Sequence, residues 1–533
     1  MKNLAKISGS LLLAITASIC SVPGSAATAA SAAAAMSTDA EVVHVLNRLA
    51  FGPRPGDIER VKKMGVDSYI EQQLNPQSLP LPEGLQTKLK SLDVMGQSAG
   101  SVLFDYQKAL KDTNDGSDAA QKKRRELVGR IIEQTAQARL YRAIESSHQL
   151  EEVMLDFWFN HFNVFNGKGL DRALVASYER DAIRPYVFGN FRDLLGATAK
   201  HPAMLFYLDN WLSTSADFHA NGRQAKAAGQ KGKSNGLNEN YAREIMELHT
   251  LGVDGGYTQK DVTELARMLT GWTFDPRAML RNNQNFYFDA DRHDNGTKQW
   301  LGKTIAPRGQ AEAEFALDVL AMHPATAHHL SFKLAQYFVA DKPAPALVDM
   351  LTKRYLDTHG DIRAVLQSLF ASAEFHDPHN MGMKYKTPYQ YVISAIRASD
   401  VPVQNVRPVL GVLAQLGMPL YGSQTPDGYK NTQDAWMNPD AITRRINFAT
   451  ALATGRLPFD KDIEEGEKMG KKQLAKQAEE KSDRPAVMPA VSAAALIQTM
   501  GAGLSGRTIE IVNGNQEALR AALILGSPDF MQH

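Results

Sequence analysis

The segment QLEEVMLDFWFNHFNV, residues 149–164, shows the residue spacing that decides the fold class. When it is placed on a helix, its polar side chains fall on one narrow stripe, which consists of Glu152, Asp156, Asn160 and Asn163. His161 falls on the other side, among large apolar side chains. The segment therefore predicts a helix whose apolar side, with His161, faces the protein interior.

Helical spacing continues through most of the chain, and several helix starts carry sequence signals. Thr38 begins a capping-box pattern. Pro202 and Pro324 each follow a histidine and precede an apolar helical run, which is the place that proline takes at the first position of a helix. Thr258 is predicted to cap the helix that follows it. These signals predict a mainly α protein.

Alternating, strand-like segments are scarce. The clearest is Asn285–Phe288, followed by a turn at 294–296 and a second short run at 299–305. We therefore predict a mainly α fold, with one large helical domain over residues 39–530 and a small β-hairpin insertion near 285–305. Three polar or charged stretches are interpreted as surface insertions, at about 111–125, 216–236 and 461–484.

The composition is that of an ordinary globular protein. The 533 residues are 44% hydrophobic and 22% charged, which sets aside collagen-like, disordered and disulfide-scaffold proteins. Lys and Arg number 59 and Asp and Glu number 58, so the chain is almost neutral. A protein whose main partner is a nucleic-acid backbone needs clustered basic charge, and we predict no such partner.

Residues 1–29 have the order of a secretory signal peptide. Lys2 and Lys6 precede a short apolar run, and small residues follow at the expected cleavage site. No stretch is long and apolar enough for a transmembrane span, so we predict a periplasmic or secreted protein. Cys20, the single cysteine, lies within this segment. Any metal in the mature chain must then be held by histidine, carboxylate or amide oxygen.

A second polar segment, NENYAREIMELH at residues 238–249, carries the densest set of candidate catalytic groups. The candidates for acid–base catalysis or anion binding are Glu239, Arg243, Glu244 and Glu247. The candidates for ligand binding are Asn238 and Asn240 in this segment, Asn160 in the first segment, and Asp294 further along the chain. The alternative interpretation is an exposed helix face with Glu–Arg pairs at four-residue spacing.

Histidines on apolar helix faces suggest a metal site. His249 falls on the apolar side of its helix, as His161 does, and two such histidines can meet in the interior. The segment 288–298 supplies a third in His293. These three histidines are the candidate ligands for a divalent metal. The alternatives are that each histidine bonds a nearby carbonyl or carboxylate, and that the acidic run around His293 is ordinary turn chemistry.

Taken in order along the chain, these segments resemble a large bacterial family of exported proteins, domain of unknown function 1800. The matching pieces are HVLNRLAFG (44–52), FWFNHF (157–162), NENYARE (238–244), LHTLGV (248–253), LTGW (269–272), the 288–298 segment, HPATA (323–327), PLYG (419–422), PDGY (426–429) and GSPDF (526–530). The resemblance implies a mostly helical, exported protein that folds as one unit. It also implies an exported partner similar to the alkaline phosphatase/sulfatase class, because members are often encoded beside such a family. It carries over no activity.

Several catalytic templates are absent from the sequence: the Walker A loop, the dinucleotide-binding glycine motif, His-Glu-x-x-His and Gly-x-Ser-x-Gly. A two-carboxylate mechanism has no short signature and stays open. We expect an exported hydrolase or lyase that acts on an envelope or extracellular polymer, such as a polysaccharide, with or without a metal. The alternative is a non-catalytic periplasmic module that binds a polymer or a partner protein and supports assembly.

Overall fold

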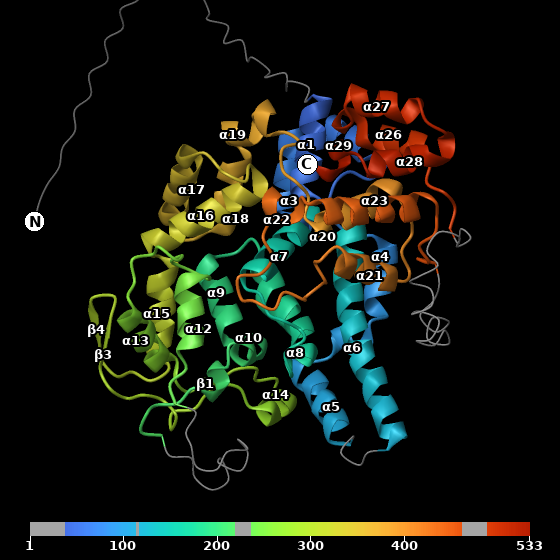
Figure 1. Cartoon of the computed structure of the whole chain (residues 1–533). Helices are drawn as coiled ribbons and strands as arrows, with labels where there is room; N and C mark the ends of the chain where they lie inside the picture. The colour runs from blue at the N-terminus through green and yellow to red at the C-terminus, as the bar shows by residue number, and fades with distance from the viewer. Residues whose placement is uncertain (1–37, 113–116, 219–235, 461–487) are drawn as a thin grey trace, which may run out of the picture. The chain divides into compact units, whose positions relative to one another are not determined.

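The 149–164 segment forms helix α7 (Gln149–His161) in the computed structural model, which describes residues 38–112, 117–218, 236–460 and 488–533. The helix is buried on nearly every side, and Leu150, Met154 and Trp158 lie in the core. It contacts α1 (Asp39–Leu49), α3 (Val66–Leu74), α6 (Asp118–Glu145) and the π-helical turn η4 (Tyr178–Ile183). Figure 1 shows α7 surrounded by helices from both halves of the chain, and the described residues form one compact unit.

The fold is mainly α, as predicted. The other elements before residue 190 are α2 (Asp57–Met64), η1 (Pro76–Ser78), α4 (Glu83–Lys90), η2 (Asp93–Gly96), α5 (Ala99–Asp112), α8 (Asp171–Ser177) and η5 (Arg184–Tyr186). The helices of the middle part are α9 (Phe191–Lys200), α10 (Pro202–Tyr207), η6 (Asn210–Leu212), α12 (Glu239–Glu247), α13 (Gln259–Leu269), α14 (Pro276–Asn282), α15 (Ala311–Ala321), α16 (Pro324–Phe338), α17 (Pro345–Asp357), α18 (Ile362–Phe370), α19 (Ala373–His376) and η7 (Pro378–Asn380). The C-terminal part contains α20 (Pro388–Ser399), α21 (Arg407–Gln415), α22 (Gln433–Trp436), α23 (Pro439–Ala453), α26 (Ala493–Met500), η8 (Gly501–Gly503), α27 (Gly506–Asn513), α28 (Glu517–Leu525) and α29 (Pro528–Met531).

The predicted helix starts are confirmed by their caps. Thr258 and the third residue of α13 form a reciprocal capping box. Pro202 and Pro324 begin α10 and α16, and the histidine before each proline accepts a backbone N–H of the first turn through its side chain. Thr38 accepts the N–H of Glu41, which is one half of the predicted capping box. The Glu41 carboxylate instead lies 3.3 Å from a ring nitrogen of His376.

The β structure differs from the single predicted hairpin. Strand β2 (Tyr287–Phe288) pairs antiparallel with β1 (Trp272–Thr273), with Trp272 opposite Phe288. Strands β3 (Lys298–Trp300) and β4 (Lys303–Ile305) form a separate hairpin. The second run folds back on itself because Leu301 and Gly302 both adopt positive φ and make a tight turn. The fold class therefore holds, while the predicted pairing of 285–288 with 299–305 is wrong.

Two halves of α6 have different environments. Its N-terminal half, up to Arg130, is exposed or half-buried, whereas Ile131–Ile144 is largely buried. The N-terminal half lies beside α5 and α8, at the lower edge of Figure 1. Residues 118–125 of the first predicted insertion thus belong to a helix. The predicted signal peptide, the insertion at 461–484 and most of the insertion at 216–236 lie outside the described residues.

Among the helices of the described ranges, none combines the length and the apolar character that crossing a membrane requires.

Two helical glycines provide a matched test of this packing. A Cβ on Gly100 of α5 would lie 2.3 Å from the backbone of Met279 in α14, whereas a Cβ on Gly129 of α6 would meet no atom within 4 Å. We expect Gly100→Ala to destabilise the protein by about 1–3 kcal/mol through overpacking. Gly129→Ala should stabilise it by up to about 1 kcal/mol through helix propensity. Thermal and urea unfolding of both variants would check this, and a shift of the same sign in both would contradict the α5–α14 contact.

Candidate functional site

The polar stripe of α7 is engaged in ion pairs within the protein. Arg184 of η5 donates to both carboxylate oxygens of Glu152, at 2.7 and 3.0 Å. Arg139 of α6 is only 3% exposed and bridges Asp156 at 2.7 Å and Glu179 of η4 at 2.8 Å. A buried charge without a partner is costly, so these carboxylates neutralise the arginines and are not available to bind a ligand.

The amides at the end of the stripe hold a loop, residues 423–431, against α7. Asn160 Nδ2 donates to the carbonyl of Tyr429, and Asn160 Oδ1 accepts the N–H of the same residue, both at 2.7 Å. Asn163 Nδ2 donates to the carbonyl of Thr425 at 2.9 Å. Asn160, a predicted ligand-binding residue, therefore fixes the position of the 423–431 loop.

The second polar segment forms α12 as predicted. Asn238 is its N-cap and accepts the N–H of Asn240 at 2.9 Å. The Asn238 Nδ2 donates to the carbonyl of Leu208 at 3.0 Å, so this amide has a structural role. Asn240 is exposed on the first turn of the helix.

Two of the four catalytic candidates join α12 to α13. Glu239 accepts hydrogen bonds from Thr263 at 2.7 Å and from Gln259 at 2.6 Å. Arg243 donates to the side-chain oxygen of Gln259 at 2.6 Å and lies 3.9 Å from Glu239. Glu239 and Arg243 thus match the alternative interpretation of the sequence, in which this helix face carries Glu–Arg pairs.

Glu244 differs from the other acidic residues of α12. Glu247 accepts a hydrogen bond from Tyr257 at 3.1 Å, whereas the described residues provide no hydrogen bond or ion pair to the Glu244 carboxylate. Burial raises the pKa of half-buried Glu244 to about 7. The charges of Glu247 and Asp427 raise it further and Arg243 opposes them. The Glu244 side chain is therefore poised to change protonation near neutral pH.

His161 and His249 meet in the interior, as predicted, with their ring centres 6.1 Å apart. His161 Nε2 lies 3.1 Å from the carbonyl oxygen of His249, so this nitrogen is the donor. His161 Nδ1 then carries the lone pair, which accepts from the ammonium of Lys333 in α16 at 2.8 Å. His329 lies one helical turn before Lys333, and the centre of its ring is 6.3 Å from the centre of the His161 ring. Both nitrogens of His161 are thus engaged within the protein.

Burial sets the charge of this cluster. It lowers the pKa of His161 far below its usual value, that of His249 to about 3 and that of His329 to about 4, and the positive charge of Lys333 adds to each shift. Burial also lowers the pKa of Lys333 to about 8, with a further contribution from Lys430 and an opposing one from Asp427. The histidines are neutral at neutral pH, and Lys333 is the cation of the cluster.

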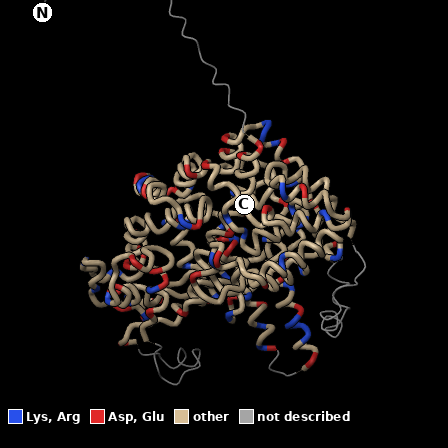
Figure 2. The backbone as a smooth tube through the Cα atoms, turned by 45° about the horizontal axis from the view of Figure 1, so that its top comes forward, with Lys and Arg blue, Asp and Glu red and all other residues tan. Residues whose placement is uncertain are grey.

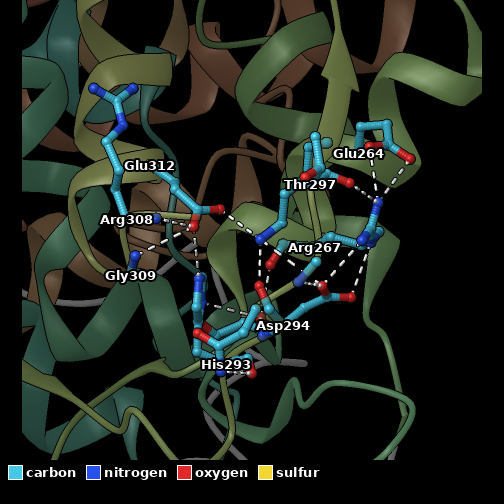
Figure 3. A network of polar contacts seen from close by, with 12 residues as sticks. Glu264, Arg267, His293, Asp294, Thr297, Arg308, Gly309 and Glu312 are labelled. Atoms are coloured by element: carbon cyan, nitrogen blue, oxygen red, sulfur yellow. Dashed lines mark hydrogen bonds and ion pairs between the residues drawn. The ribbon is translucent and has the colours of Figure 1, made fainter. Parts of the chain in front are cut away.

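His293 belongs to a different network, shown in Figure 3. Its Nδ1 lies 2.9 Å from the carbonyl oxygen of Thr270, and its Nε2 lies 3.2 Å from a carboxylate oxygen of Glu312. Glu312 is fully buried, lies 2.5 Å from the ammonium of Lys298 and accepts the N–H of Arg308 at 2.7 Å. These contacts fasten the 288–298 segment to α15.

Asp294 fastens the same segment to α13. Arg267 donates to both of its carboxylate oxygens, at 2.9 and 3.0 Å. The Arg267 guanidinium and burial act in opposite directions, and the net effect is a lowered pKa of Asp294. Asp294, predicted to bind a ligand, is therefore the partner of a structural arginine.

The predicted metal site is not assembled. His293 bonds Thr270 and Glu312 and does not join His161 and His249. Over the part of the chain that the structure describes, no group of three or more His, Cys, Asp or Glu side chains is arranged to hold a metal ion. His161 and His293 each find internal hydrogen-bond partners, which was the alternative interpretation, whereas the buried Nε2 of His249 has no hydrogen-bond partner among the described residues.

The comparison with protein families agrees with the sequence resemblance. The model of a family described as "protein of unknown function (DUF1800)" matches residues 44–532, nearly the whole chain. The chain belongs to the DUF1800 family. No curated protein and no solved structure matches it.

In this DUF1800 protein Glu244 and Lys333 have pKa values of about 7 and about 8, and we refer to these two groups as the acid–base pair. Both are half-buried, and Asp427 of the 423–431 loop is an electrostatic neighbour of both. The sequence predicted Glu244 as one of four catalytic candidates, and Lys333 was not among them. The signal for Lys333 was its position four residues after His329 in α16, which places the two side chains on one face of that helix.

The raised pKa of Glu244 predicts a pH dependence of stability. The folded state holds the Glu244 proton more tightly than the unfolded chain, whose value is 4.5. The contribution to stability is full below about pH 4.5 and is lost as the pH rises through about 7. Between pH 5 and pH 8 we therefore expect the wild type to lose more thermal stability than Glu244→Gln. Parallel melting-temperature profiles for the two proteins would contradict the raised pKa.

Proposed function

We propose that this protein is an exported hydrolase or lyase that cleaves an envelope or extracellular polymer by acid–base chemistry at Glu244 and Lys333. The observation that carries the proposal is the pair of pKa values, about 7 for Glu244 and about 8 for Lys333. A base and an acid with pKa values near the working pH are what proton-transfer catalysis requires, and such shifts cluster at functional sites.

The two residues take complementary roles in the proposed reaction. Ionised Glu244 removes a proton, from an attacking water in hydrolysis or from a carbon of the polymer in elimination. Protonated Lys333 donates a proton to the oxygen of the leaving group. His161 is a positioning residue, because its Nδ1 lone pair orients the Lys333 ammonium at 2.8 Å. The 423–431 loop places Asp427 near both groups, and its charge raises both pKa values.

The sequence supports export, and export in turn favours a substrate outside the cytoplasm. Residues 1–29 match the order of a signal peptide, and a polymer outside the cytoplasm is the substrate class that an exported acid–base enzyme meets. The metal-assisted form has less support, because the described residues contain no set of three suitable ligands. The proposed chemistry therefore contains no metal-dependent step.

A second candidate function is favoured by a different observation. An open groove lined by arginines lies between α6 and α8, contains neither Glu244 nor Lys333 in its lining, and suits a binding module better than a catalyst. In that function the protein binds a polymer or an exported partner, such as a protein of the phosphatase/sulfatase-like class. Glu244→Gln separates the two, because a pure binding module keeps its biological activity in this variant.

The catalytic proposal predicts a bell-shaped pH profile. With ionised Glu244 and protonated Lys333 as the active form, kcat/KM should fall below about pH 7 and above about pH 8. We expect Glu244→Gln to lower kcat/KM by about 10²–10⁴-fold and to remove the acidic limb. Lys333→Arg, which keeps the charge, should move the alkaline limb upward.

The assay is a panel of exported polysaccharides. New reducing ends report hydrolysis, and ultraviolet absorbance of an unsaturated product reports elimination. Glu59→Gln on α2 is the matched control, because Glu59 is an exposed helical carboxylate in another part of the fold. Wild-type activity in Glu244→Gln would refute the role of Glu244.

Metal removal tests the chemistry independently. After dialysis against a chelator we expect the melting temperature and the cleavage rate to stay unchanged, because neither the histidine cluster nor the His293 network offers a metal site. Elemental analysis of the purified protein accompanies the assay. A loss of activity that added Zn²⁺ restores would show that the reaction depends on a metal.

A further inference from the structure

An open groove lies between α6 and the first turn of α8. Its volume is about 570 Å³, which lies in the range of small-ligand sites. Three arginines, Arg124, Arg125 and Arg172, line it, together with Gln121 and the apolar side chains of Val128 and Ile132. We call this surface the arginine groove.

The sequence of α6 explains why these side chains share one face. Gln121, Arg125, Val128 and Ile132 recur at three- and four-residue spacing, so they lie in a row along the helix. After Ile132 this face of α6 enters the core, but up to that residue the row stays open, and Ile132 itself is 37% exposed. The groove is therefore formed by the solvent-exposed part of a helix face. In the C-terminal half of α6 the same face is buried in the core.

Within the described part of the chain, the arginines of the groove have no ion-pair partner. Two neighbouring cations of α6 are paired: Lys122 lies 3.7 Å from Glu126 and Arg130 lies 3.4 Å from Asp93. In contrast, the described residues form no ion pair with Arg124, Arg125 or Arg172, and no acidic residue lines the groove. The basic run near the start of α6 forms the blue segment on the lower helices in Figure 2.

We propose that the arginine groove binds a segment of an acidic polysaccharide. Guanidinium groups form two parallel hydrogen bonds with carboxylate, sulfate or phosphate, so three of them fit repeated anionic groups along a chain. The exposed faces of Val128 and Ile132 offer apolar contact to the C–H faces of sugar rings. A concave site of this volume suits a polymer segment better than the flat surface of an anionic membrane.

This inference names the acidic class of polymer for the proposed function, but binding in the groove does not require the acid–base pair. The polymer is held by α6 and α8, whereas Glu244 and Lys333 lie on α12 and α16. Glu244→Gln should therefore bind the polymer as the wild type does, even where cleavage is lost. The experiments can therefore contradict the catalytic proposal and the proposal of polymer binding in the arginine groove separately.

The direct test is fluorescence anisotropy of the full-length mature protein with fluorescein-labelled oligogalacturonate, at low and at high salt. We expect binding that weakens with salt, and no binding of labelled dextran, which is neutral. The triple variant Arg124→Gln/Arg125→Gln/Arg172→Gln should lose at least about tenfold in affinity.

The matched control also removes three positive charges, all from α6 and all outside the lining of the groove. The variant Lys122→Gln/Lys123→Gln/Arg130→Gln should change affinity by less than about twofold. Equal losses in the two triple variants would show attraction by net charge alone and overturn the groove. Equal affinity for dextran and oligogalacturonate would overturn the charge argument. If the protein binds anionic phosphatidylglycerol vesicles and does not bind the oligosaccharide, the proposed ligand is wrong and the groove is a membrane-binding surface.

A substitution without a charge change tests the shape of the groove. Gly129 lies on its wall, and a Cβ there meets no atom within 4 Å. Gly129→Leu fills this space and also favours the helix. We expect weaker oligogalacturonate binding together with an unchanged or higher melting temperature, so that loss of binding cannot be attributed to unfolding. Full affinity in Gly129→Leu would overturn the location of the site.

Discussion

The buried guanidinium of Arg139 is the contact on which the arrangement of the candidate site depends. It pairs with Asp156 of α7 and Glu179 of η4, and Tyr421 donates to the same Glu179 at 2.7 Å. One charge cluster thus ties α6, α7, η4 and the chain before the 423–431 loop together. Removing one partner of such a buried pair costs about 3–5 kcal/mol, because the other charge stays buried without compensation.

The same stripe of α7 then sets the electrostatics of the acid–base pair. Asn160 and Asn163 hold the 423–431 loop through its backbone, and the loop carries Asp427. Asp427 raises the pKa of Glu244 and opposes the lowering of the pKa of Lys333. A structural contact at the C-terminal end of α7 is therefore linked to the proton affinity of Glu244 and Lys333, through a loop that is distant in sequence.

The histidines show how an identical residue type takes different roles. His161 has a carbonyl on one nitrogen and an ammonium on the other, which keeps its ring neutral and orients Lys333. His293 lies between a carbonyl and the buried carboxylate of Glu312, and it fastens a segment to the helical core. The sequence shows which residues are near His161 and His293 along the chain. The role of each histidine depends on the hydrogen-bond partner that another helix or loop supplies.

Local patterns were sufficient for the helical fold, the caps at Thr258, Pro202 and Pro324, the family, and the meeting of His161 with His249. Those features depend on short-range spacing, on backbone capping and on apolar faces that must be buried. The pairing of β2 with β1, the engagement of Glu239 and Asn160, the location of His293 and the part played by Lys333 were decided by tertiary structure. Each of them depends on a partner from another element, and the energy of a buried polar group depends on which partner packing brings within hydrogen-bond distance.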